Sequence, residues 1–119
     1  MSLVYVNSQS NTGTCLLTAA AGLATWNLTS LSVSMSGPTR GPNAKLVIYD
    51  GAVGSTVLFA VYLDQPTGSV GMTQEIPLHK DALGRPSVQA LPGNALNIVV
   101  NGTGVNNVSI NARFTDGLP

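Results

Sequence analysis

This chain of 119 residues has five basic and five acidic side chains, so 8% of its residues are charged and the net charge is zero. An average soluble domain has about 25% charged residues; here Ser, Thr and Asn together number 32, and Gly adds 13. A surface of neutral hydroxyls, amides and backbone is poorly suited to acid–base catalysis, phosphate binding or electrostatic steering. We therefore expect no enzyme activity, no cofactor and no metal site, and a surface that packs against another protein.

The length predicts a single domain over residues 1–119, which is enough chain to bury roughly two-thirds of its unfolded surface. The longest apolar run, 57–63, is far shorter than the roughly 20 residues of a membrane-spanning helix, so we expect no membrane contact. The N-terminal residues lack a basic region, an apolar core and a cleavage site, which predicts cytoplasmic synthesis without a signal peptide. Cys15 has no second cysteine to pair with, and we expect it to be buried and inert.

Alternation of apolar and polar residues with a period of two predicts strands, whereas no segment has a capped helical pattern. Segment 15–23 comes nearest to a helix but is better explained by a strand end and a turn. Segment 25–36 alternates with a change of phase near Thr29 and Ser30, which predicts a bulge or a bend between two sheets. The apolar residues are Trp26 and Leu28 before this change and Leu31, Val33 and Met35 after it.

Segments 45–49 and 56–63 are apolar on both faces. A strand of this kind is covered on both sides, and in so small a domain we expect the second cover to come from another subunit. Tyrosine suits such an interface, since its ring is buried while its hydroxyl finds a partner. The candidate interface residues are Val47, Tyr49, Leu58 and Tyr62, with core packing an open alternative for the two tyrosines.

Towards the C-terminus, segments 95–100 and 105–115 also alternate, and the glycines of 101–104 between them favour a tight turn. These two segments are therefore predicted to form a hairpin. Turn signals at short intervals divide the chain into eight or nine strands, too many for one open sheet of this length. The sequence predicts an all-β, two-sheet antiparallel sandwich, most simply a jelly roll, with an immunoglobulin-like sandwich as the alternative.

Ionisable residues form no catalytic or metal-binding pattern. His79 and Asp81 are close in sequence, but no nucleophile motif accompanies them, and a solvated loop explains them better. Asp50 precedes Gly51, a pair typical of a turn, and a calcium site there is the weaker interpretation. Five basic residues at zero net charge do not supply a surface for nucleic acid. We expect Trp26 to pack in the core, although exposed aromatics would suit a sugar-binding platform.

The types of strand follow one another along the chain in a recognisable order. They are a Thr-x-Thr strand at 12–17, a strand of alternating Ser and apolar residues at 31–35, a hairpin at 45–61, a strand with proline at 74–78, and a closing pair at 93–100 and 105–114. This succession resembles the small jelly-roll proteins in the virions of tailed bacteriophages. The resemblance covers nearly the whole chain but contains no signature motif, so it assigns a role to no individual residue.

The resemblance implies a capsid decoration, or cement, protein that binds the outer capsid surface and bridges capsid subunits. It further implies a trimer, the major capsid protein as partner, a place on the capsid surface, synthesis in the host cytoplasm and no contact with nucleic acid. Val47, Tyr49, Leu58 and Tyr62 are then the candidate residues for the oligomer or capsid interface. The alternative function is a carbohydrate-binding, lectin-like module, including an accessory domain of a tail or fibre.

Overall fold

The computed structural model describes residues 3–10, 14–19, 25–36, 44–63, 72–78, 82–83, 88–101 and 107–115. These segments form strands and turns and contain no helix, as the alternating pattern predicts. The strands are β1 (Leu3–Ser10), β2 (Cys15–Ala19), β3 (Asn27–Ser36), β4 (Lys45–Asp50), β5 (Thr56–Tyr62), β6 (Met72–Glu75), β7 (Leu96–Asn101) and β8 (Asn107–Thr115). The expected all-β class is confirmed.

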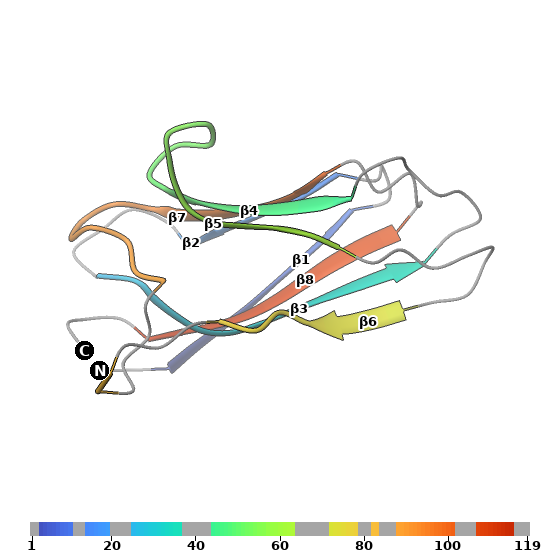
Figure 1. Ribbon diagram of the computed structural model, residues 1–119, viewed down its shortest axis with the longest axis horizontal. Coiled ribbons are helices and arrows are strands. Elements are labelled where there is room, and N and C mark those ends of the chain that lie inside the picture. Colours follow the sequence, from blue (N-terminus) through green and yellow to red (C-terminus); the bar gives the residue numbers. More distant parts are fainter. Residues whose placement is uncertain are drawn as a thin grey trace.

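The strands form two four-stranded antiparallel sheets, β1-β8-β3-β6 and β2-β7-β4-β5, that lie in two layers (Figure 1). The pairs are nested: β1 pairs with β8, β2 with β7, β3 with β6 and β4 with β5. A chain with this nesting is a long hairpin rolled into a sandwich, which is the arrangement of a jelly roll. The immunoglobulin-like alternative places its strands in the order ABED and CFG, and this chain does not adopt it.

The predicted hairpin of segments 95–100 and 105–115 is wrong. β7 lies between β2 and β4 in one sheet, whereas β8 lies between β1 and β3 in the other. The connecting residues 102–106 lie outside the described part of the chain. An alternating pattern shows that a strand has one buried face. A strand with one buried face fits equally well in either sheet of a sandwich, so the pattern does not identify its neighbouring strands.

The β4–β5 hairpin is present as the pattern predicts. In its turn Gly51 and Gly54 have φ values of 85° and 89°, which lie in the left-handed region that residues with a Cβ rarely adopt. Gly51 N donates to Ala95 O at 2.8 Å, so the turn is held against the segment that leads into β7.

The core lies between the sheets and takes every second residue of their strands. Its largest fully buried side chains include Leu28, Phe114 and Ile110 from one sheet and Leu17, Leu46, Ile48 and Ile98 from the other. Each such side chain contributes about 1.5–3 kcal/mol through burial. Trp26 is half-buried and meets Phe114 edge-on, with ring centroids 5.8 Å apart.

The phase change in segment 25–36 is a β-bulge, which confirms the first of the two predicted explanations. Leu28 pairs with Phe114 and Ser30 with Arg113, so Thr29 is the extra residue of β3. Its Oγ1 donates a hydrogen bond of 2.9 Å to Arg113 O. The bulge keeps the apolar residues on both sides of it directed at the core.

Candidate interaction face

The two sheets have different outer faces. The outward residues of β1-β8-β3-β6 whose side chains the structure describes are polar and include Asn7, Gln9, Ser32, Ser34, Thr73, Ser109 and Asn111. Asn7 Nδ2 donates to Ser109 Oγ at 3.0 Å and to Asn111 Oδ1 at 2.6 Å. The hydroxyls of Ser34 and Thr73 are 2.9 Å apart. This face is a hydrogen-bonded layer of hydroxyls and amides.

The outer face of β2-β7-β4-β5 is apolar at its centre. The strand register places Leu16, Val99, Val47 and Ala60 in one row across all four strands. Tyr62 lies on one side of this row, and Tyr49 and Val57 lie on the other. We call these seven residues the apolar face. Leu16, Val57 and Tyr62 are 47%, 54% and 69% exposed, so the described chain leaves about half or more of each side chain uncovered.

Polar groups beside the apolar face are paired within the sheet. Thr18 Oγ1 donates to Asn97 Oδ1 at 2.5 Å, and Asn97 Nδ2 donates to Gly51 O at 2.7 Å. Thr14 Oγ1 donates to Asn101 Oδ1 at 3.0 Å. Since these groups already have partners, removing water from them costs less free energy than it would for unpaired groups.

Among the described residues, Lys45 is the charged residue that lies beside the apolar face, where it pairs with Tyr62 in the strand register. Its Nζ lies 5.6 Å from the centroid of the Tyr62 ring, which is a cation–π contact. The positive charge of Lys45 therefore lies over the exposed ring of Tyr62.

The structure brings three of the four candidate residues together. Val47, Tyr49 and Tyr62 all belong to the apolar face. Leu58 lies at a register shift, because Ile48 pairs with Phe59 while Tyr49 pairs with Val57. Leu58 packs against the buried core and is not part of the apolar face.

Sequence reasoning missed Leu16, Val57, Ala60 and Val99 as members of this face. The available signal was that Leu16 and Val99 lie in runs that are apolar on both faces, like those of β4 and β5. The register shift in β5 has no comparable signal, and it brings Val57 to the outer face.

Asp50 has a structural role in the turn after β4. Its carboxylate accepts hydrogen bonds from Leu91 N at 3.2 Å and Asn94 Nδ2 at 3.0 Å. Ser55 Oγ donates to Asp50 O at 2.8 Å. Asp50 therefore lies at a turn, as predicted. Its carboxylate also binds the β4–β5 turn to the loop before β7. Among the described residues no three potential metal ligands lie together.

Other candidate residues have no visible role in a site. Cys15 is buried, as predicted, and its Sγ lies 3.4 Å from Ser8 O. His79 and Asp81 lie outside the described residues. Within the described segments no helix is long and apolar enough to cross a membrane.

Comparisons with known proteins show only distant similarity. No protein-family model matches the sequence, and no curated protein matches it significantly. A solved structure described as "CBM4 structure and function" is similar with a TM-score of 0.39 and 9% identity, over 98% of this chain and 81% of that one. The structure of the infectious bursal disease virus Gx strain is similar with a TM-score of 0.33 and 10% identity, over 95% of this chain and 34% of that one. This chain thus spans about a third of the viral chain. At this level neither similarity indicates a function.

Proposed function

We propose that this chain is a structural virion protein, a capsid decoration protein that binds the major capsid protein through the apolar face and bridges neighbouring capsid subunits. The observation that carries this proposal is the uncovered row of Leu16, Val99, Val47 and Ala60 on a molecule with almost no surface charge. A rigid sandwich with one apolar outer face is suited to docking and needs no cofactor.

The size of the face favours a repetitive partner. Four strands about 4.8 Å apart, with three outward positions about 6.7 Å apart on each, span about 400 Å², and the apolar face occupies only part of that area because Thr18, Asn97, Asn101 and Lys45 take other outward positions. A stable interface of standard size buries about 800 Å² on each partner. One apolar face therefore binds weakly, but several faces that bind one lattice together gain affinity through multivalency. A trimer, which belongs to the same proposal, presents three such faces.

A carbohydrate-binding module fits the described aromatic residues less well. A sugar platform needs an open ring face, yet Trp26 is half-buried against Phe114, and Lys45 lies over the ring of Tyr62. Tyr49 is half-buried in the middle of the sheet.

Co-sedimentation with purified capsids of the phage that encodes the chain tests the proposal. We expect saturable binding at a fixed number of copies per capsomer. Leu16→Glu places a charge in the apolar row and should weaken binding at least about tenfold, because that charge would be desolvated on docking. Gln9→Glu adds the same charge on the polar face of the other sheet and should leave binding unchanged.

Two results contradict the proposal. One is failure of the wild-type chain to pellet with capsids that lack their decoration protein. The other is equal binding by the Leu16→Glu and Gln9→Glu variants, which would place the contact elsewhere. Thermal unfolding of both variants shows whether each is folded before binding is compared.

A further inference from the structure

β5 is an edge strand of the sheet β2-β7-β4-β5, and one side of its backbone has no hydrogen-bond partner within the described chain. Leu63 N donates to Ala44 O at 2.9 Å, just beyond the β4–β5 ladder. Since hydrogen bonds alternate between the two sides of an antiparallel strand, Val61 also bonds to β4. The N–H and C=O groups of Ala60 and Tyr62 therefore point away from β4, towards the free edge.

The exposure of the side chains agrees with an open edge. Val61 packs against the core on the inner side of the sheet, as does its partner Leu46. Leu46 is fully buried, whereas Val61 is only half-buried. On the outer side Tyr62 is 69% exposed. Water therefore reaches both sides of β5 along this edge.

β5 also lacks the features that keep an exposed edge from pairing. Edge strands are usually very short, or they carry charges or prolines that prevent the addition of another strand. The seven residues Thr56–Tyr62 include neither a charged residue nor a proline. The opposite edge of the same sheet is different, because Ser8 Oγ donates to Leu16 O at 2.6 Å and so holds β1 against β2. The sheet can therefore be extended at β5.

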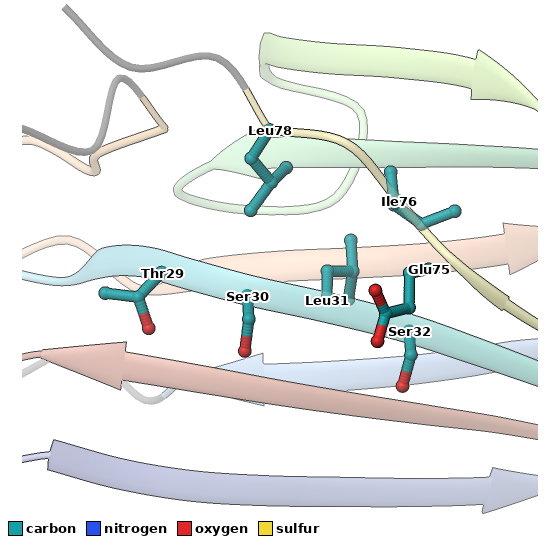
Figure 2. A pocket seen from close by; sticks show the side chains of 7 residues that line it. All are labelled: Thr29, Ser30, Leu31, Ser32, Glu75, Ile76 and Leu78. Carbon is teal, nitrogen blue, oxygen red and sulfur yellow. The ribbon is translucent and has the colours of Figure 1, made fainter. Parts of the chain in front are cut away.

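A shallow groove of about 180 Å³ beside β3 offers no comparable surface. Its lining, shown in Figure 2, is Thr29, Ser30, Leu31, Ser32, Glu75, Ile76 and Leu78. Leu31 and Ile76 belong to the buried core. The hydroxyls of Ser30 and Ser32 point to the opposite side of β3 from Leu31 (Figure 2). The groove therefore presents no continuous apolar surface to a partner, in contrast to β5.

We propose that β5 of one copy of the chain pairs antiparallel with β5 of a second copy about a twofold axis, so that two four-stranded sheets become one continuous sheet. The open backbone groups of Ala60 then bond those of Tyr62 of the second copy, and the two Val61 residues lie opposite each other at the axis. Alanine opposite tyrosine leaves room for the ring on the outer face. Because β5 carries no charge, two identical strands meet without repulsion.

The area of the apolar face favours a second copy as the occupant of this edge. One apolar face is too small for a standard interface of about 800 Å² per partner, and Ala60 and Tyr62 belong to that face. Pairing places the apolar faces of two copies side by side and so doubles the contiguous apolar area. The pair itself buries little surface and is weak, so it joins copies that are concentrated, including those of neighbouring trimers in the proposed function. The inference does not depend on capsid binding.

Disulfide cross-linking of the full chain in solution, without capsids, tests the pairing. In the proposed register the two Val61 Cα atoms lie about 4.5 Å apart, which is within the range that a disulfide spans. Cys15 is buried and does not compete. Under mild oxidation at high protein concentration, Val61→Cys should form a linked dimer at least about tenfold faster than Val57→Cys, because only the thiols at position 61 meet. Val57 is the more exposed of the two, so random collision would give the opposite order.

A second pair of variants tests the edge in the Val61→Cys background. Ala60→Lys places a charge opposite Tyr62 of the second copy, whose ring already carries the charge of its own Lys45, and should slow cross-linking by about threefold. Thr56→Lys adds the same charge at an exposed position of β5 outside the paired segment and should leave the rate unchanged. Thermal unfolding checks that each variant is folded before the rates are compared.

Equal cross-linking of the Val57→Cys and Val61→Cys variants, or equal rates with Ala60→Lys and Thr56→Lys, would overturn the proposal. Protection of the Ala60 and Tyr62 amides from hydrogen exchange on capsids, without cross-linking in solution, would assign the edge to a strand of the capsid protein and would equally overturn it. Because the cross-linking needs no capsids, its failure is distinct from a failure of the co-sedimentation that tests the proposed function.

Discussion

Among single residues, Asp50 is a buried acid whose carboxylate holds a turn against a loop. It is one of four buried polar residues in the described chain, and both of its carboxylate oxygens accept a hydrogen bond. Its donors, Leu91 N and Asn94 Nδ2, belong to a loop about 40 residues further along the chain, so the contact closes one end of the sandwich. Its burial and these two hydrogen bonds indicate a structural role for this acid.

Replacing this acid tests that role. Asp50→Ala leaves Leu91 N and Asn94 Nδ2 without their acceptor, so we expect the free energy of unfolding to fall by about 1–3 kcal/mol. Urea denaturation followed by fluorescence measures the change. Glu75→Gln, at an exposed acid, should alter the same quantity by no more than about 0.5 kcal/mol. Similar losses in the two variants would show that the Asp50 contacts do not stabilise the turn.

Two strand irregularities decide which side chains face outward. In β3 the bulge at Thr29 keeps Leu28 and Leu31 on the buried face, and it is visible in the sequence as a change of phase. In β5 the register shift turns Leu58 towards the core and Val57 outward. That shift cannot be read from the sequence, because 57–63 is apolar at every position and gives the same pattern with or without it.

The bulge can be tested by removing it. Deletion of Thr29 restores strict alternation and leaves Leu28 and Leu31 on the same face in their present register, so we expect the unfolding free energy to fall by no more than about 1 kcal/mol. Thr29→Val keeps the chain length and removes only the hydrogen bond to Arg113 O, at a cost of about 1 kcal/mol. Chemical denaturation of the two variants separates these effects. A loss of about 3 kcal/mol or more from the deletion but not from the substitution would show that the strand does not keep this register without the extra residue.

The whole molecule is a sandwich with two unlike outer faces. Outward positions of β1-β8-β3-β6 carry hydroxyls and amides that bond one another, whereas those of β2-β7-β4-β5 carry the apolar face. With zero net charge, identical copies do not repel one another when they are crowded on a surface. One apolar face is less than half the size of a standard interface, so the proposed function needs several faces joined in one particle.

The small area of the apolar face predicts that the chain assembles into an oligomer. We expect light scattering to give three times the chain mass of 12.2 kDa, because three linked faces compensate for weak binding by each one. The Leu16→Glu variant should keep that mass while losing capsid affinity, since in the proposed function the apolar face binds the capsid. A strict monomer across the micromolar range would contradict the trimer, and loss of the trimer in Leu16→Glu would assign the apolar face to self-association.

The sequence alone determined the all-β class, the β4–β5 hairpin, the change of phase near Thr29 and Ser30 and the burial of Cys15, because each follows from local alternation or turn chemistry. The tertiary structure decided that β7 and β8 lie in opposite sheets and that Leu16 and Val99 complete the row begun by Val47. These features depend on which strands are neighbours. Backbone pairing is nearly independent of side-chain identity, so alternation fixes the buried side of a strand but leaves its partner to the packing of the whole chain.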